Sequence, residues 1–254
     1  MALTSEWRLR IEQWLNILRT LVYEPLGSIT FEGSLTRTHL DAADLPRASF
    51  KPMPAGTCWG AMWEYCWFKG AVTLPASARG ARIVLCADVG AEAAVLIDGV
   101  EAGAIDGMHK EITLTRSGVP GTRYEILIEA YAGHGPTPCG SGPIPHGVAS
   151  VPLPPPRQRT VGTSTFGIWH EDLYQAWLDV TTLLQLRDHI DKDALRVAEI
   201  DEALRAFTCL ADPELPRADM LRTVRAARAR LKPLLACRNG STAPRLYCFG
   251  HSHI

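Results

Sequence analysis

The sequence lacks several features that would place it in a class at once. No apolar run approaches the roughly 20 residues that a membrane-spanning helix needs, and the first residues lack the basic and apolar regions of a secretory signal. The 26 Lys and Arg are balanced by 27 Asp and Glu, for a formal net charge of -1. The basic surplus typical of nucleic-acid-binding proteins is therefore missing. We expect neither a membrane nor a nucleic acid as a partner.

Disulfide and nucleotide-binding patterns are missing too. The seven cysteines are odd in number and include no C-x-x-C pair, which argues against a disulfide framework and a thiolate zinc site. We expect free thiols packed as small apolar groups in a reducing cytoplasm. Gly133-His134-Gly135 is followed by proline rather than by a helix, so it is no dinucleotide-binding loop, and the nucleophile motif Gly-x-Ser-x-Gly is absent.

What is present predicts a mainly β protein with flanking helices. With 254 residues and 46% hydrophobic residues, the chain is long and apolar enough for a globular core. Residues 1–26 are expected to hold an N-terminal helix over 6–23, because apolar residues recur there at steps of three and four. Ser5 is the predicted N-cap residue. Such a helix is stable only when its apolar stripe packs against a larger body.

Residues 27–135 are predicted to form an antiparallel β-sandwich of the jelly-roll type, an accessory domain. Short apolar runs alternate there with turns rich in Gly, Pro and Asp, and Asp98-Gly99 has the composition of a tight hairpin turn. The expected strands cover residues 57–74, 82–87, 93–97, 110–115 and 123–131.

The rest of the chain divides into a linker, a helical connector and a short final strand. Residues 136–160 are read as a linker, since 136–156 hold eight of the 18 prolines. Residues 161–240 are expected to form a helical connector with three amphipathic helices, as a small bundle or a lid. Residues 241–254 contain an apolar run resembling a buried strand of a parallel sheet, followed by His251-Ser252-His253. Metal ligands often follow such strands; the alternative is that both histidines are exposed tail residues.

Four segments resemble the glycoside hydrolase family 38 α-mannosidases of the cytosolic and bacterial type. Residues 250–254 (GHSHI) are similar to the opening of the catalytic domain of that family, where a strand runs into G-H-x-H-[IL]-D. Residues 59–69 resemble its W-G-x5-W-F-[RK] strand, with six residues between Gly60 and Trp67. Residues 104–112 resemble its G-[LI]-D-x-x-H-x-E-[IV] segment, with Ala104 at the first position. Residues 123–131 fit the following E-x-x-x-E-A strand. The order of these parts makes the match more specific than any one motif.

The resemblance implies a function and a cofactor. It identifies the chain as the N-terminal accessory part of a zinc-dependent retaining α-mannosidase acting on terminal α-mannosides, ending in the first strand of a truncated α/β barrel. It implies that His253 is a zinc ligand and that the remaining ligands, the nucleophile and the acid/base lie elsewhere. The chain alone is therefore expected to be inactive. Its local role would be to pack on the catalytic domain, shape the substrate cleft and support contacts in a homo-oligomer.

The alternative is a free-standing carbohydrate-binding or interaction module without catalysis. Trp59, Trp63 and Trp67 share one parity of the expected strand and would form a platform for stacking sugars; equally, they would form a buried face between two sheets. Asp106 and His109 either reach toward a neighbouring domain or fix a turn. Other charged groups are expected on solvated or contact faces: Glu125 and Glu129 on a strand, Arg222, Arg225 and Arg228 on a helix, and His170, Glu171 and Asp172 in a first helical turn.

Overall fold

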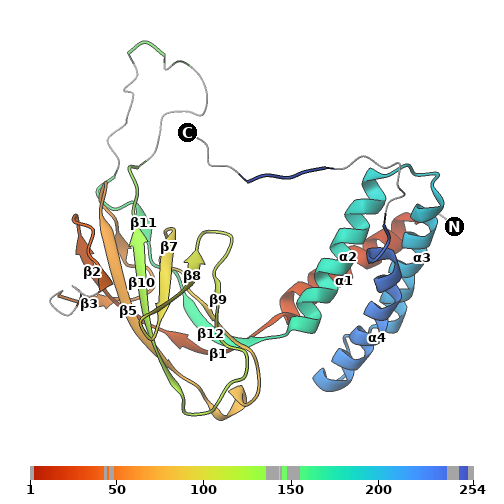
Figure 1. Cartoon of the computed structure of the whole chain (residues 1–254), viewed down its shortest axis with the longest axis horizontal. Coiled ribbons are helices and arrows are strands. Elements are labelled where there is room, and N and C mark those ends of the chain that lie inside the picture. The colour runs from red at the N-terminus through yellow and green to blue at the C-terminus, as the bar shows by residue number, and fades with distance from the viewer. Residues whose placement is uncertain are drawn as a thin grey trace. The chain divides into compact units, whose positions relative to one another are not determined.

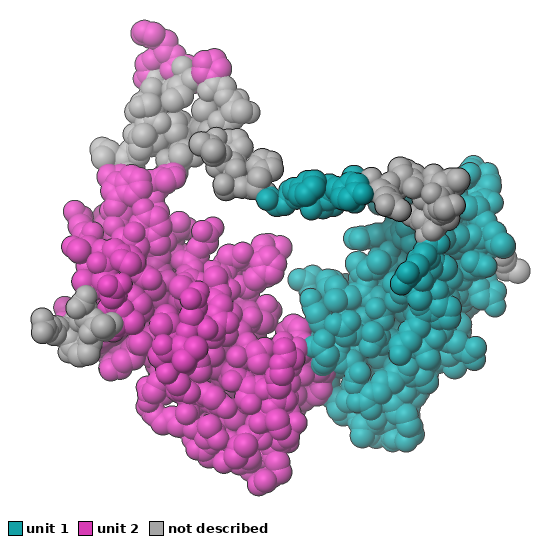
Figure 2. Space-filling view, viewed as in Figure 1, with its two compact units in different colours: residues 1–22, 171–254 teal, residues 23–170 magenta. Residues whose placement is uncertain are grey.

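A computed structural model describes residues 3–42, 45, 49–135, 143, 145–147, 155–238 and 246–250. The chain divides into two compact units. One unit, Tyr23–His170, is built of β-strands, and the other combines Met1–Val22 with Glu171–Ile254 and is helical (Figures 1 and 2). The helical unit thus draws on both ends of the chain.

The β unit is a sandwich whose named strands all pair antiparallel (Figure 1). The six-stranded sheet has the order β3 (Lys51–Met53), β2 (Phe31–Thr36), β5 (Tyr65–Thr73), β10 (Arg123–Tyr131), β7 (Ala93–Ile97) and β8 (Val100–Ile105). The four-stranded sheet has the order β1 (Tyr23–Ile29), β12 (Ser164–Trp169), β6 (Ile83–Cys86) and β9 (Glu111–Thr115). A small third sheet pairs β11 (Arg159–Thr160) with β4 (Cys58–Trp59), and a 3-10 turn, η2, covers Ala76–Ala78.

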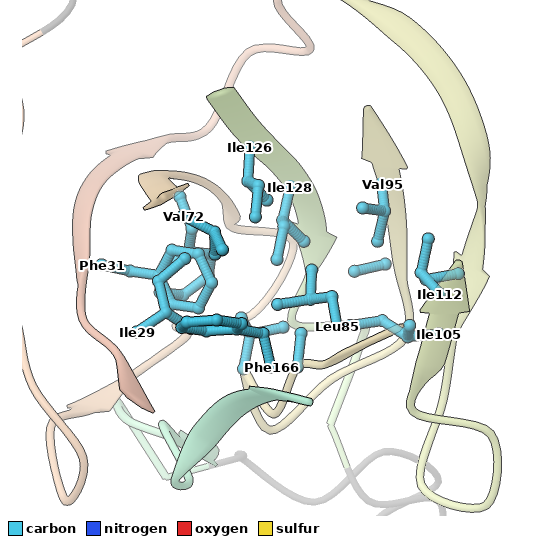
Figure 3. Close-up of a cluster of buried hydrophobic side chains, with 14 of the residues drawn as sticks. Ile29, Phe31, Val72, Leu85, Val95, Ile105, Ile112, Ile126, Ile128 and Phe166 are labelled. Atoms are coloured by element: carbon cyan, nitrogen blue, oxygen red, sulfur yellow. The ribbon is translucent and has the colours of Figure 1, made fainter. Parts of the chain in front are cut away.

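The core of the sandwich follows from strand alternation. Because successive side chains of a strand point to opposite faces, Ile126 and Ile128 of β10 enter the core together with Val95 of β7 (Figure 3). Leu85 and Phe166 enter the same cluster from the four-stranded sheet. Each fully buried side chain of this size contributes roughly 1.5–3 kcal/mol to folding. The predicted antiparallel sandwich is confirmed.

The hairpin between β7 and β8 forms where the sequence predicts it. Asp98 has φ 51° and Gly99 has φ 79°, so both central residues occupy the left-handed region that a type I′ turn requires. The peptide N–H of Glu125 donates to the Asp98 carboxylate at 2.8 Å, which ties the turn to β10.

The expected single strand over residues 57–74 is wrong. Gly60 has φ 90° and Trp63 has φ 63°, and these two positions interrupt the extended backbone. The segment therefore divides into β4, which pairs with β11, and β5, which lies inside the six-stranded sheet. A Cβ atom at Gly60 would lie 2.8 Å from that of Ala132, so only glycine fits there.

The sandwich also extends beyond residues 27–135. β1 begins at residue 23, inside the segment expected to be purely helical, while β11 lies in the expected linker and β12 in the expected helical connector. β12 is held in place by pairing with both β1 and β6. These long-range pairs decide its structure, and Ser164 and Gly167 obscure the local apolar pattern.

The helical unit contains α1 (Ser5–Leu21), α2 (Glu171–His189), α3 (Leu195–Leu210) and α4 (Arg217–Leu235). The three helices expected in the connector are present, and α1 packs on α2 and α3, which supplies the larger body that its apolar stripe needs. The rings of Trp14 and Phe207 meet edge to face, with centroids 6.1 Å apart. The N-cap of α1 is Thr4 rather than Ser5, since the Thr4 hydroxyl accepts from the Trp7 N–H at 3.5 Å.

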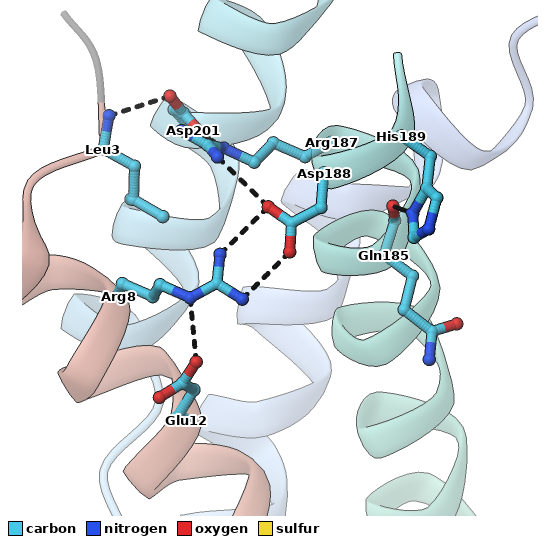
Figure 4. A network of polar contacts seen from close by, with 8 residues as sticks. All are labelled: Leu3, Arg8, Glu12, Gln185, Arg187, Asp188, His189 and Asp201. Atoms are coloured by element: carbon cyan, nitrogen blue, oxygen red, sulfur yellow. Dashed lines mark hydrogen bonds and ion pairs between the residues drawn. The ribbon is translucent and has the colours of Figure 1, made fainter. Parts of the chain in front are cut away.

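A polar network joins three elements of this unit (Figure 4). Asp201 of α3 is 0% exposed, and its carboxylate accepts from the Leu3 N–H and from the Arg187 guanidinium, each at 2.9 Å. Arg8 of α1 donates twice to the carboxylate of Asp188 on α2, each time at 2.9 Å. The Arg8 guanidinium holds the pKa of Asp188 below its ordinary value. The network fixes α1 and Leu3, which lies two residues before the helix begins, against α2 and α3.

The final described stretch differs from the sequence-based expectation. Residues 246–250 form no strand, and Leu246 and Phe249 are 88% and 82% exposed. No described strand pairs with these five residues, and the rest of the strand expected in 241–254 lies outside the described residues. Among the described residues, no helix is long and apolar enough to cross a membrane.

Candidate functional site

The predicted metal ligand lies outside the part of the chain that is described. His253 and its neighbour His251 both fall there. Within the described ranges, no group of three or more His, Cys, Asp or Glu side chains is arranged to hold a metal ion. The described residues therefore do not fit a zinc site.

The three tryptophans expected on one strand do not form a shared platform. Trp59 is buried, and its indole N–H donates to the Val89 carbonyl at 2.9 Å. Trp67 is also buried, whereas Trp63 is 51% exposed, with its ring centroid 5.8 Å from that of His134. The interpretation of a face buried between the two sheets thus holds for Trp59, which belongs to the core cluster, but not for Trp67, which is buried outside that cluster, opposite Glu129 of β10. The left-handed backbone at Trp63 separates it from both.

Asp106 and His109 fix a turn. The Asp106 carboxylate accepts from the backbone N–H groups of Met108 and His109 at 2.6 and 2.7 Å. His109 Nδ1 lies 3.0 Å from the same carboxylate. Hydrogen bonds from the His109 ring and backbone lower the pKa of Asp106 to about 2, and the carboxylate in turn raises the pKa of His109. Both side chains remain accessible to solvent at the rim of a cavity.

The remaining charged candidates are engaged within their own units. On α4, Arg225 and Arg228 form ion pairs with α2 residues Asp172 and Asp179, at 2.6 Å each. Further contacts are Arg222 with Asp219, His170 with Glu24, Gln175 with Glu171, and Arg123 with Glu125. The Arg225 and Arg228 pairs join α4 to α2, as the contact-face interpretation predicts. The contacts of Arg222, Glu171 and Glu125 each lie within a single helix or strand.

The register of the six-stranded sheet builds a cavity on the face opposite the core. Glu129 of β10 lies opposite Ala94 of β7, which lies opposite Ala104 of β8. Two residues after Glu129 on β10, Tyr131 lies opposite Tyr65 of β5. Because the two alanines are small, the outer face is hollow beside the larger residues.

The cavity has a volume of about 610 Å³. Its lining comprises His39, Tyr65, Glu92, Ala93, Ala94, Ala104, Ile105, Asp106, His109, Glu129 and Tyr131. The volume lies within the roughly 300–1,000 Å³ typical of small-molecule sites, and the cavity opens widely to solvent. A second hollow of about 470 Å³ adjoins it and shares Glu92, Ile105, Asp106 and Tyr131.

Aromatic rings and a carboxylate form one wall of this cavity. The rings of Tyr65 and Tyr131 stack with centroids 4.7 Å apart and planes at 30°, and His39 meets the Tyr65 ring edge to face at 5.7 Å. Glu129 Oε1 is buried and has no hydrogen-bond partner among the described residues. His39 Nε2 lies 3.1 Å from this oxygen, at ion-pair distance but without hydrogen-bond geometry.

Sequence reasoning did not single out most of this site. Glu129, Asp106 and His109 were noted separately, whereas His39, Tyr65, Glu92 and Tyr131 were not candidates. The available signal was the shared parity of Glu129 and Tyr131 at the end of one strand. Their partners come from three other strands and from two loops, which carry His39 and the pair Asp106 and His109, so only the tertiary fold brings them together.

Comparison with known proteins identifies relatives of this chain. Residues 30–144 match a family model described as "Alpha-mannosidase, jelly roll domain". Human Alpha-mannosidase 2C1 is 24% identical over 224 residues, which cover 87% of this chain and 20% of that protein. The chain thus spans about a fifth of the length of this curated relative.

Solved structures were also compared. A β-glucuronidase from Ruminococcus gnavus in complex with uronic deoxynojirimycin is 14% identical, with a TM-score of 0.41, over 59% of this chain and 29% of that one. The complex of the same enzyme with D-glucuronic acid gives 14% identity and a TM-score of 0.41, over 59% and 30% of the two chains. The family and sequence matches confirm the predicted resemblance: this chain is similar to the N-terminal region of the family 38 α-mannosidases, and its residues 30–144 match their jelly-roll domain.

Proposed function

We propose that the chain is the non-catalytic N-terminal part of a zinc-dependent retaining α-mannosidase that hydrolyses terminal α-mannosides. The observation that carries this proposal is the alignment with human Alpha-mannosidase 2C1, which takes in 87% of this chain but 20% of that protein. The family match of the sandwich to an α-mannosidase jelly-roll domain supports it. The proposal gives the sandwich and the helical unit an accessory role beside a separate catalytic region.

The engagement of charged side chains supports a structural role for the helical unit. Arg228 and Asp179 are 20% and 14% exposed and pair with each other, and Asp201 is buried against Arg187. These groups are committed to holding helices and are not arranged around a substrate. The helical unit would therefore support the catalytic region. We also propose that one of the two units contributes contacts to a homo-oligomer.

Zinc and the retaining mechanism enter through the family resemblance alone. His253 is the one residue proposed as a ligand, and the described residues offer no cluster to complete a site. In the complete enzyme, zinc would hold sugar hydroxyls, and a carboxylate pair would carry the two displacements of a retaining glycosidase. We expect the 254-residue chain to retain no stoichiometric zinc after dialysis and to hydrolyse no p-nitrophenyl α-mannoside.

A cytoplasmic location is proposed because the described cysteines form no disulfide bonds. The six cysteines in the described ranges are all free. Burial raises the pKa of the Cys66 thiol to about 12 and that of Cys86 to about 11, so these two remain protonated and unreactive. Free thiols of this kind are typical of reducing compartments.

The decisive experiment is to sequence the encoding gene beyond codon 254 and to assay the protein that it encodes. The proposal predicts an Asp codon next, several hundred further codons, and α-mannosidase activity that a chelator removes. Deleting residues 1–240 from that protein is expected to abolish stable activity. A stop codon after residue 254 would overturn the proposal, and so would a deletion variant as active as the intact enzyme.

The alternative, a free-standing carbohydrate-binding module, is favoured by a different observation. The outer face of the six-stranded sheet carries a preformed cavity with aromatic and carboxylate side chains. A stop codon after residue 254 combined with saturable sugar binding would favour this module over the accessory part of an enzyme.

A further inference from the structure

We propose that the cavity over Ala94 and Ala104 is a non-catalytic binding site for a neutral hexopyranose at the end of a glycan. The class of ligand follows from the chemistry of the lining, and the choice of mannose as the hexose rests on the proposed function. Nothing in the family and structure matches assigns a role to this cavity.

The first argument is that the hollow is preformed. Its floor is made by strands β7, β8 and β10 inside one continuous sheet, and not by loops. Backbone pairing fixes Ala94 and Ala104 in register with Glu129, so the small and large residues keep their places without a ligand. A site built on strands costs little reorganisation when it is filled.

The second argument concerns the aromatic wall. A pyranose ring presents C–H groups on its faces, and these pack on aromatic surfaces. Tyr131 is stacked on Tyr65 at 4.7 Å, and His39 packs on Tyr65 at 5.7 Å. This three-ring cluster restricts the orientation of Tyr131, so its apolar surface is available at low entropic cost. Two phenol hydroxyls at the same wall add polar groups able both to donate and to accept.

The third argument is the unsatisfied carboxylate. Glu129 Oε1 is buried, and His39 Nε2 lies 3.1 Å from it at ion-pair distance, but no described group donates a hydrogen bond to it. Leaving a buried acceptor without a hydrogen bond destabilises the protein, and a sugar hydroxyl that donates to Glu129 Oε1 would remove this penalty. Native proteins rarely leave such atoms unpaired unless a ligand or water completes the site.

The charge of the lining selects the ligand. Glu92, Asp106 and Glu129 line the cavity together with two histidines, and no Lys or Arg is among the lining residues. Three carboxylates repel phosphorylated sugars, uronic acids and other anions. Neutral polyols meet no such repulsion, and their hydroxyls donate to carboxylates. A small amine is the competing ligand that this lining would also attract.

The test is a titration of the whole 254-residue chain labelled with ¹³C at alanine methyl groups. Methyl α-D-mannopyranoside is added to about 100 mM, a hundredfold above a dissociation constant on the order of 1 mM. We expect saturable shifts of the Ala94 and Ala104 methyl signals, while the core methyl of Ala130 stays in place. Mannose 6-phosphate is expected to bind at least about tenfold more weakly because of its charge.

Two pairs of variants separate binding at the cavity from general effects on folding. Ala104→Leu fills the hollow and is expected to weaken binding more than about tenfold. Ala102→Leu, an exposed position on the same strand outside the lining, is its control and is expected to change binding less than about twofold. Glu129→Gln removes the carboxylate and is expected to weaken binding about fivefold, whereas Glu125→Gln on the same strand leaves it unchanged.

Three results would overturn the inference. The first is the absence of saturable shifts at Ala94 and Ala104, and the second is mannoside binding that survives Ala104→Leu. The third is that putrescine, a small amine titrated in the same way, binds in the cavity while the sugar does not. Each is distinguishable from failure of the proposed function. A silent titration combined with an active encoded α-mannosidase rejects the cavity alone, and sugar binding by a chain whose gene stops at codon 254 rejects the enzyme alone.

Discussion

The buried carboxylate of Asp201 offers the sharpest test of how the helical unit is held together. Asp201 is fully buried on α3 and accepts two hydrogen bonds at 2.9 Å, from the Leu3 N–H and from Arg187 Nε (Figure 4). The Asp201→Ala variant removes both acceptor contacts at once. It also leaves the Arg187 guanidinium with Asp188 as its remaining carboxylate partner, at 3.1 Å.

The expected cost follows from these contacts. A hydrogen bond to a charged group contributes about 1.5–3 kcal/mol, and breaking a buried ion pair costs roughly 3–5 kcal/mol. Arg187 is 23% exposed and keeps Asp188, so its charge stays partly solvated and paired. We therefore expect the lower end, about 3 kcal/mol. Asp201→Asn keeps one acceptor oxygen, so its free energy of unfolding is expected to fall by about half as much.

Urea unfolding followed by the helical circular dichroism signal at 222 nm measures this loss, since all four described α-helices lie in the helical unit. With a slope of about 2 kcal/mol/M, the midpoint of Asp201→Ala is expected to fall by about 1.5 M. The matched control is Asp172→Asn, which breaks the partly exposed pair with Arg225 and is expected to cost less than about 1 kcal/mol. Equal midpoints for Asp201→Ala and this control would refute the reasoning.

Two further predictions concern turns of the sandwich. Gly90→Ala places a methyl group against a neighbouring carbonyl oxygen at φ 78°, whereas Gly99→Ala, at φ 79°, meets open space. Gly90→Ala is therefore expected to lower the free energy of unfolding by more than about 2 kcal/mol, and Gly99→Ala by about 1 kcal/mol. Urea unfolding followed by tryptophan fluorescence measures both values, and equal losses would contradict the steric argument. Asp106 raises the pKa of His109, and His109 lowers the pKa of Asp106 to about 2, so the stabilisation from their charged pair is present in mildly acidic solution. It is lost as the pH rises through the folded pKa of His109 and as the pH falls through the folded pKa of Asp106. An NMR titration should show this pKa falling toward the ordinary value in Asp106→Asn, and an unchanged pKa would reject the pairing.

The elements that the sequence predicts well are those whose signals are local. The strands over 93–97 and 123–131 match β7 and β10 in the structure. In β10, apolar residues recur at every second position from Tyr124 to Ala130, whereas β7 is a continuous apolar run that ends at the Asp98-Gly99 turn. The helices are also anticipated, because an apolar stripe repeated over four or five turns leaves little doubt about its period.

The elements that the sequence predicts poorly depend on distant partners. β12 has six residues, two of them Ser164 and Gly167, and becomes a strand by pairing with β1 and β6, about 140 and 80 residues earlier in the chain. The break at Gly60 and Trp63 is hidden for a related reason. Four aromatic residues of one parity suggest a continuous strand, while the left-handed backbone at Trp63 is set by its tertiary surroundings and has no sequence signature.

The candidate cavity and the core use alternate positions of the same strands, which makes binding and stability separable. On β10, Ile128 and Ala130 point into the core, whereas Glu129 and Tyr131 line the cavity on the outer face. Substituting Glu129 leaves every core contact in place, so its main effect falls on the ligand. Truncating Ile128 opens a void and costs about 2–5 kcal/mol, while the outer face keeps its register with β5 and β7. A one-residue slip of β10 would exchange these roles and destroy both, so the register that builds the core is also what assembles the cavity.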